Sequence, residues 1–183
     1  HSDIVGGVAL ADDMKLLKTI NGLRNSLGGM PNPHTAWLLT RSLETLKIRA
    51  EKAAENAQRC AEFLAKHPKV AAVSFLGLLK EGDADYEVYR KQHTGPGSLI
   101  SVNIKGGEQE AFAFLDHLKI IKLAVSLGST ESLAQHPAAM THSGLTPEAK
   151  QASGVTDDLV RISIGIENAD DLIWDLGQAL EHV

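Results

Sequence analysis

A strand-like run near the C-terminal end of the chain contains Arg161, the side chain with the clearest chemical potential. The stretch "DDLVRISIGIEN" alternates, which predicts a β-strand whose apolar face holds Val160, Ile162, Ile164 and Ile166. Arg161 then shares the opposite face with Ser163 and Gly165, whose small size leaves room beside a guanidinium. A guanidinium held by a strand suits bidentate binding of a carboxylate or phosphate. An ordinary ion pair with a nearby Asp or Glu is the alternative.

A second candidate site is the stretch rich in small and polar residues that runs from Leu127 to Pro147 between two predicted strands. Long irregular loops in compact domains are often functional. Gly128 would let backbone N–H groups approach a ligand closely, and hydroxyl groups are supplied by Ser126, Ser129, Thr130 and Thr141. The alternative is that these hydroxyls only satisfy turns and helix caps.

Two histidines in the same loop, His136 and His142, raise the alternative of a zinc site. Metal sites usually need three or four ligands, and neither Cys nor a carboxylate stands beside them at a ligand-like spacing. We therefore predict no metal. The G-x-S-x-G, G-x-G-x-x-G and G-x-x-x-x-G-K-[ST] motifs are absent from the sequence, which argues against the simplest hydrolase and nucleotide-binding assignments.

The N-terminal quarter of the chain predicts a strand, a helix and then a long helical run. "DIVGGVAL" suggests a buried strand, and residues 11–29 a helix that stops at Gly28 and Gly29. Pro31 and Pro33 break the chain before a helical pattern that lasts to residue 67, with a kink expected near residues 46–52. One face of this run is expected to be buried, with Cys60 as a small core residue, through Leu39, Leu43, Leu46, Ala50, Ala53, Ala57, Cys60 and Leu64.

The remainder of the chain alternates between strands and helices. Strands are predicted at residues 70–75, 98–104, 122–126 and 159–166, and helices at 108–118 and after Asn168, with a helix or irregular insertion at 83–93. Asn168 is a good N-cap for the last helix, because its side chain can accept a hydrogen bond from a free backbone N–H. The pattern as a whole predicts an α/β chain in which helices cover a small sheet.

Composition and charge narrow the classes of partner. The 183 residues carry a formal net charge of −5, with both signs interspersed, which argues against a nucleic-acid partner. No apolar run is long enough to span a membrane, and no secretion leader stands at the start. Cys60 is the single cysteine, so an internal disulfide framework is excluded and a cytoplasmic location is expected.

Three segments together resemble a known family. The His-Ser-Asp opening, "LAVSLGSTESLAQHPAAMTHSG" and "GVTDDLVRISIGIENADDLIWDLGQAL" are similar to the Cys/Met-metabolism family of pyridoxal-phosphate enzymes, over essentially the whole chain. The resemblance implies the C-terminal portion of a fold-type-I enzyme. Residues 1–48 would be the tail of the large cofactor-binding domain, and residues 49–183 the small C-terminal α/β domain with a mainly antiparallel sheet.

The resemblance also assigns roles to residues. Arg161 falls where the family places the arginine that clamps the substrate α-carboxylate. Ser126 matches the serine near that carboxylate, Thr141 lines the same pocket, and Val125 and Leu127 flank the serine. The cofactor would be pyridoxal 5′-phosphate, and its Schiff-base lysine, in a Ser-x-Thr-Lys segment, is expected upstream of His1. No cofactor-binding residue is assigned within the chain.

The implied activity is carbon–sulfur bond cleavage by γ-elimination on a small amino acid. Apolar Val125 favours chemistry like that of methionine γ-lyase, because an apolar residue suits a thioether methyl group better than a second amino-acid head group. Cystathionine γ-synthase, cystathionine γ-lyase and O-acylhomoserine sulfhydrylase chemistry are the alternatives, and a catalytically silent binding or dimerisation module is the alternative of another class. The family further implies a homo-oligomer built as a dimer of dimers.

Overall fold

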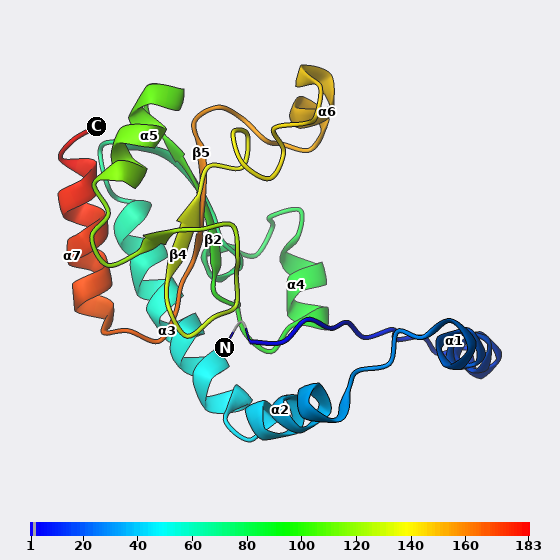
Figure 1. The fold of residues 1–183 in the computed structure, drawn as a ribbon. Coiled ribbons are helices and arrows are strands. Elements are labelled where there is room, and N and C mark those ends of the chain that lie inside the picture. The colour runs from blue at the N-terminus through cyan, green and yellow to red at the C-terminus, as the bar shows by residue number, and fades with distance from the viewer. Residues whose placement is uncertain (2) are drawn as a thin grey trace. The chain divides into compact units, whose positions relative to one another are not determined.

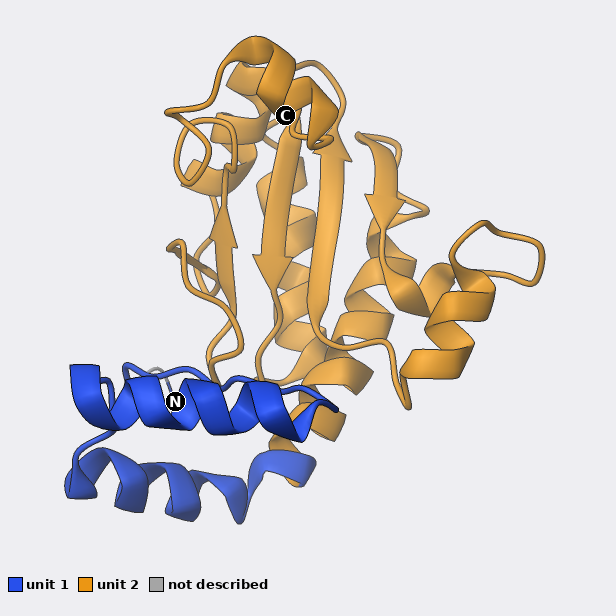
Figure 2. Ribbon diagram, turned by 90° about the vertical axis from the view of Figure 1, so that its right-hand side faces the viewer, with its two compact units in different colours: residues 1–47 blue, residues 48–183 orange. Residues whose placement is uncertain are grey.

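The computed structural model describes residues 1 and 3–183, which divide into two compact units, residues 1–47 and 48–183 (Figure 2). The division falls inside helix α3 (Leu46–Leu64), beside the boundary that the sequence suggested. That the two units belong to a large and a small domain stays a prediction.

The first unit contains two capped helices. Asp13 accepts a hydrogen bond from Lys15 N–H (2.8 Å) at the start of α1 (Met14–Leu27), and the Asn32 side chain accepts one from Thr35 N–H (2.8 Å) at the start of α2 (Pro33–Leu43). The predicted strand at residues 3–10 is wrong, because this segment has no regular secondary structure. It contains two consecutive glycines, which weaken a strand, and its backbone pairs with no strand of the described residues.

The long helical run is two helices, because a turn at residues 44–45 separates α2 from α3. The expected buried stripe is confirmed from Ala53 onward, at Ala53, Ala57, Cys60 and Leu64. It is wrong for the earlier positions Leu39, Leu43, Leu46 and Ala50, which are exposed. Helical spacing identifies a face but not what packs on it, and the core of this structure meets only the later turns of α3.

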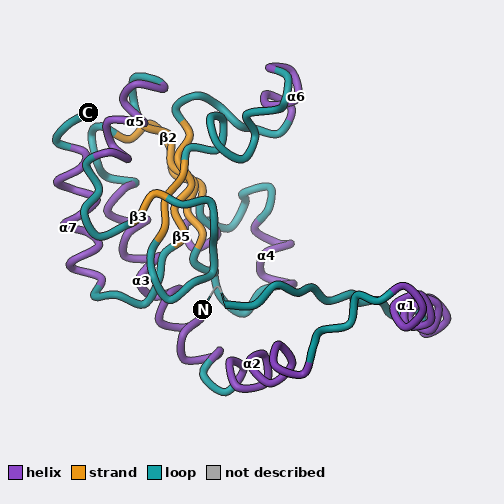
Figure 3. The backbone as a smooth tube through the Cα atoms, in the orientation of Figure 1, coloured by secondary structure: helices purple, strands orange, loops and turns teal. Residues whose placement is uncertain are grey.

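The second unit is built on a five-stranded sheet. Its strands are β1 (Val70–Ser74), β2 (Leu99–Ile104), β3 (Lys122–Leu123), β4 (Leu133–Gln135) and β5 (Leu159–Ser163), in the order β1-β2-β5-β4-β3 (Figure 3). All neighbouring pairs are antiparallel except β3 and β4. The predicted α/β fold with a mainly antiparallel sheet is therefore confirmed.

Strand β4 lies inside the stretch that the sequence suggested to be a continuous loop. Its three residues carry no β-branched side chain and stand between serines and a His-Pro pair, so the local sequence gives little strand signal. The strand forms because β5 offers it a partner on one side and β3 on the other. The predicted strand at residues 122–126 shortens to Lys122–Leu123.

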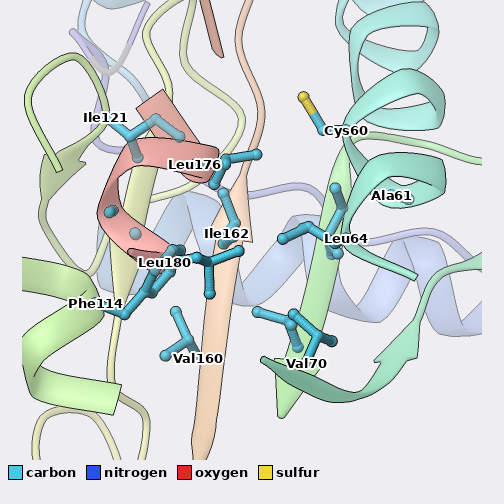
Figure 4. Packing of buried hydrophobic residues seen from close by; sticks show 14 of the residues in the cluster. Cys60, Ala61, Leu64, Val70, Phe114, Ile121, Val160, Ile162, Leu176 and Leu180 are labelled. Atoms are coloured by element: carbon cyan, nitrogen blue, oxygen red, sulfur yellow. The ribbon is translucent and has the colours of Figure 1, made fainter. Parts of the chain in front are cut away.

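Three helices cover one face of this sheet and form the core with it: α3, α5 (Glu108–Asp116) and α7 (Ala169–Leu180) (Figures 1 and 4). The expected N-cap of α7 is confirmed, with Asp170 N–H donating to Asn168 Oδ1 at 2.8 Å. Shorter elements complete the unit: η1 (Leu76–Leu78), α4 (Tyr86–Gln92) and α6 (Pro147–Ala152). Among the described helices, none is long and apolar enough to cross a membrane.

Cys60 lies within this core, next to Ala61 and Leu64 of the same helix (Figure 4). Burial raises the pKa of its thiol to about 12, against the smaller opposing effect of the Arg59 charge. The group therefore stays a neutral thiol at physiological pH, and the prediction of a small core residue rather than a nucleophile is confirmed.

A buried carboxylate connects α7 to the segment after α5. Asp175 is fully buried, and its two oxygens accept hydrogen bonds from the backbone N–H groups of Lys119 (2.8 Å), Ile120 (2.9 Å) and Ile121 (2.9 Å). Gln178 Nε2 donates to it as well, at 3.1 Å. These bonds hold the chain that leads into β3, and so they set the edge of the sheet on which β4 is built.

We predict that Asp175→Asn lowers the free energy of unfolding by roughly 3 kcal/mol, because an amide NH₂ would face buried N–H donors and leave at least one of them unsatisfied. Urea unfolding followed by circular dichroism measures the change. The matched control is Asp116→Asn, an exposed acid at the end of α5, which should shift stability by less than about 0.5 kcal/mol. Equal effects of the two substitutions would contradict this role.

Candidate functional site

The site is centred on Arg161 in β5, between Val160 and Ile162, which are both fully buried in the core. Because side chains alternate along a strand, Arg161 points to the sheet face opposite the helices α3, α5 and α7. Its register partners are Ser101 on β2 and Gln135 on β4. A polar row therefore crosses the sheet on that face, through Ser74, Ser101, Arg161 and Gln135.

The guanidinium of Arg161 is held by neutral acceptors. Its Nη2 donates to the backbone carbonyl of Val125 at 2.6 Å and to that of Ser126 at 3.3 Å. Burial lowers the pKa of the guanidinium, but an arginine stays protonated at neutral pH. No acidic side chain among the described residues pairs with it. Among the described residues the guanidinium therefore has no ionic partner, and the alternative of an ordinary ion pair is wrong for them.

The segment of residues 125–128 is tied to β5 at two points. Arg161 binds its first two carbonyls, and Gly128 N–H donates to the Oγ of buried Ser163 at 3.0 Å. Gly128 has φ = +75°, in the left-handed region that favours glycine, so the turn here depends on the absence of a side chain. This anchoring holds the backbone of Ser126 against the guanidinium, and the Ser126 hydroxyl makes no hydrogen bond with the described residues.

Thr141 joins the same site through Gln135. Gln135 is only 1% exposed, and its Nε2 donates to Thr141 Oγ1 at 3.3 Å. The Thr141 hydroxyl also lies 2.9 Å from Nδ1 of His142. Gln135 is the register partner of Arg161, so Thr141 contacts a side chain that neighbours the guanidinium. The fold thus brings Val125 and Ser126 to Arg161 directly and connects Thr141 to it only through Gln135.

His136 forms hydrogen bonds through both of its ring nitrogens. It is buried, its Nε2 lies 2.7 Å from the Asp157 carbonyl, and its Nδ1 accepts a hydrogen bond from Ala139 N–H at 3.1 Å. Both ring nitrogens are therefore occupied, which matches a neutral imidazole that donates from Nε2. In the described part of the chain, groups of three or more His, Cys, Asp or Glu side chains able to hold a metal are absent.

A second polar cluster closes the other end of the β4 segment. Glu167 accepts from the backbone N–H of Ser132 (2.5 Å) and from its hydroxyl (2.9 Å), and Ser132 Oγ accepts from Gly165 N–H (2.8 Å). Asn56 of α3 donates to the carbonyls of Gly165 and Glu167. The backbone N–H groups of Ser132 and Gly165 are thereby satisfied where the segment enters β4.

Sequence reasoning therefore missed Gln135 and the pair of Ser132 and Glu167, while it placed Ser163 on the face of Arg161 without giving it a role. Gln135 differs from its neighbours by standing as a polar residue in a strand, and the pairing register alone shows that it flanks the guanidinium. Leu127 lies in the anchored segment with about half of its side chain exposed, so its role toward a substrate stays a prediction.

Comparison with known proteins shows which family and which proteins this chain is similar to. The family model for Cys/Met metabolism PLP-dependent enzymes matches residues 1–181. The chain belongs to this family. It is 42% identical to L-methionine gamma-lyase of Fusobacterium nucleatum subsp. polymorphum and 46% identical to cystathionine gamma-lyase of Saccharomyces cerevisiae, in each case over 100% of the chain and 46% of the relative.

A solved structure agrees with these sequence relatives. The crystal structure of metB from Corynebacterium glutamicum superposes with a TM-score of 0.91 at 40% identity, covering 99% of this chain and 46% of that one. The chain therefore spans about half the length of the curated relatives and of the structure that it matches.

Membership of this family implies pyridoxal 5′-phosphate as the cofactor. Of an amino acid held by that cofactor, the described residues fit one group, the carboxylate of the amino acid. Arg161 offers an unneutralised cation on a strand, and its Nη2 is held by the backbone carbonyls of Val125 and Ser126. The ring and phosphate of the cofactor are not assigned to residues of this chain.

We predict that Gly128→Ala destabilises the protein by about 1 kcal/mol, because an alanine pays a steric cost at the positive φ of this turn. Space is not the obstacle, since an added Cβ would meet nothing within 4 Å. Chemical unfolding measures the effect. Gly144→Ala is the matched control, because Gly144 lies in the same loop region with similar open space and no positive φ. Equal stability of the two variants would contradict the role of Gly128.

Proposed function

We propose that the chain is the C-terminal part of a pyridoxal-phosphate enzyme that cleaves a carbon–sulfur bond of a sulfur-containing amino acid by γ-elimination. The observation that supports it most directly is the partly buried, positively charged Arg161, whose only partners in the described structure are neutral carbonyls. The family and the γ-lyase relatives supply the reaction class.

In this proposal Arg161 binds the substrate α-carboxylate through two parallel N–H···O bonds, which gives both affinity and orientation. Orientation matters because it sets which bond of the amino acid faces the reacting centre. Hydrogen bonds from Nη2 to the Val125 and Ser126 carbonyls hold the guanidinium in position before the substrate binds. The Ser126 hydroxyl adds a donor to the same carboxylate. When bound, pyridoxal phosphate acts as the electron sink that makes a proton of the amino acid removable.

The side chain of Val125 supports a substrate with an apolar end. It is 51% exposed, and its own carbonyl lies 2.6 Å from Arg161 Nη2, so in this proposal the isopropyl group lies next to the bound amino acid. An apolar surface there suits a thioether methyl group better than a charged head group, because burying an unpaired charge is costly. This favours chemistry like that of methionine γ-lyase.

Cystathionine cleavage is the second candidate, favoured by the 46% identity to the Saccharomyces cerevisiae cystathionine gamma-lyase. The same carboxylate site would serve both substrates, and also a γ-replacement on an O-acylhomoserine. Turnover of the full-length protein with methionine, cystathionine and O-acylhomoserine distinguishes these reactions. The proposal expects methionine to be cleaved with the highest kcat/KM.

We predict that Arg161→Ala in the full-length protein raises KM for amino-acid substrates by about 100-fold or more, because two charge-assisted hydrogen bonds are lost. Steady-state kinetics measures the change, and cofactor absorbance shows that pyridoxal phosphate is still bound. Arg161→Lys should recover only part of the loss, because an ammonium group lacks the planar fork.

The matched control is Arg59→Ala. Arg59 lies on α3, which covers the opposite face of the sheet, and it pairs with Asp170 at the surface. Its removal changes the net charge by the same amount and should leave KM within about twofold. A KM for Arg161→Ala equal to that of the control would overturn the carboxylate assignment.

We further propose that the full-length protein works in the cytoplasm as a homo-oligomer built as a dimer of dimers. Exposed apolar side chains in the first unit support it, since such surfaces are typical of regions that another polypeptide covers: Val5, Val8, Leu10, Trp37, Leu39 and Leu43. Light scattering on the full-length protein is expected to give four times the mass of one chain. A monomeric mass would contradict the proposal.

A further inference from the structure

The side chain of Gln135 has a buried oxygen without a partner. Gln135 is 1% exposed, its Nε2 donates to Thr141, and its Oε1 makes no hydrogen bond with the described residues. A buried acceptor left unpaired costs free energy, so it needs an explanation. The other such oxygen, Asn56 Oδ1, belongs to helix α3, which packs on the core face of the sheet, opposite the face of Arg161.

The nearest element to Gln135 is the strand that carries the cation. Gln135 and Arg161 are directly opposed in the antiparallel pair of β4 and β5, and directly opposed residues project their side chains to one face with Cβ atoms about 5 Å apart. A guanidinium has only donors, so the oxygen of the amide is the end that can serve it. Thr141 orients the amide by accepting from its nitrogen at 3.3 Å.

The guanidinium of Arg161 has more hydrogen-bond donors than it has partners, and Gln135 Oε1 can accept a hydrogen bond from one of them. A guanidinium carries five N–H groups, and in this structure only Nη2 has partners, the carbonyls of Val125 and Ser126. A bidentate carboxylate takes the two parallel N–H groups of one edge of the guanidinium, and each such edge includes an Nη2 hydrogen. The other Nη2 hydrogen stays on the Val125 carbonyl, which leaves two of the five donors. Ligand binding excludes water from these two donors, so they need an acceptor from the protein.

We propose that Gln135 is a positioning residue for Arg161. When a carboxylate binds, Gln135 Oε1 accepts a hydrogen bond from one of the two remaining guanidinium donors and fixes the guanidinium in the plane that the carboxylate requires. The inference rests on the proposed role of Arg161 and deepens it, because it names the residue that selects one orientation of the guanidinium. Gln135 itself touches neither the substrate nor the cofactor in this account.

The test measures binding of glycine to the full-length holoenzyme by calorimetry, with methylamine as a probe that lacks the carboxylate. Gln135→Met removes the acceptor at nearly equal volume, and the expected result is a Kd for glycine about tenfold weaker, with methylamine binding unchanged. In an Arg161→Ala background, Gln135→Met should cause no further loss, because a positioning residue acts only through its target.

Two further variants make the result specific. Ser101→Ala is the matched control, since Ser101 opposes Arg161 from the other side, and it should bind glycine normally. Gln135→Glu places a carboxylate against the guanidinium, and it should weaken glycine binding more than Gln135→Met does, through competition for the fork. This second variant keeps a polar side chain and carries the test if Gln135→Met folds poorly.

The outcomes separate the two proposals. Normal glycine binding by both Gln135 variants, with weak binding by Arg161→Ala, would overturn the inference and leave the carboxylate site intact. An equal loss from Gln135→Met with and without Arg161 would also overturn it, because the effect would then be general. Normal glycine binding by Arg161→Ala would overturn both proposals.

Discussion

The charge of Arg161 and the neutrality of its partners are the constraint on which the site depends. The guanidinium is partly buried on a central strand, and its hydrogen bonds go to the carbonyls of Val125 and Ser126. Carbonyl oxygens can orient a cation, but they do not cancel its charge. An acidic side chain paired with Arg161 would have neutralised the guanidinium and left no charge for a ligand. The described structure instead holds a positioned, unneutralised fork, which is costly for a protein unless an anion completes it.

One strand serves both the core and the site. Val160 and Ile162 of β5 pack against α3, α5 and α7, while Arg161 between them points to the other face. Because the core residues cannot slip by one position without exposing themselves, the register that protects the core also sets the position of the guanidinium. The core also fixes the positions of Gln135 on β4 and Ser163 on β5, because each stands beside a core residue and projects to the polar face. The site is therefore as rigid as the core behind it.

The sequence predicts those features that a local pattern determines. The alternation around Arg161, the helical spacing of α7 and the cap at Asn168 all lead to what the structure contains. The roles of Ser126 and Thr141 came only with the family resemblance, and they stay proposals. Strand β4 and the pairing of Gln135 with Arg161 were not predictable, because a three-residue strand without β-branched residues exists only through its neighbours. The strand expected at residues 3–10 does not form for the opposite reason, since its local pattern finds no partner strand in the described residues.

The measurement that tests the central claim most directly is a crystal structure of the full-length protein with glycine bound. The account predicts that both oxygens of the glycine carboxylate lie within about 3 Å of Arg161 nitrogens, while Nη2 keeps its bond to the Val125 carbonyl. A carboxylate bound elsewhere, with Arg161 turned onto an acidic side chain, would contradict it.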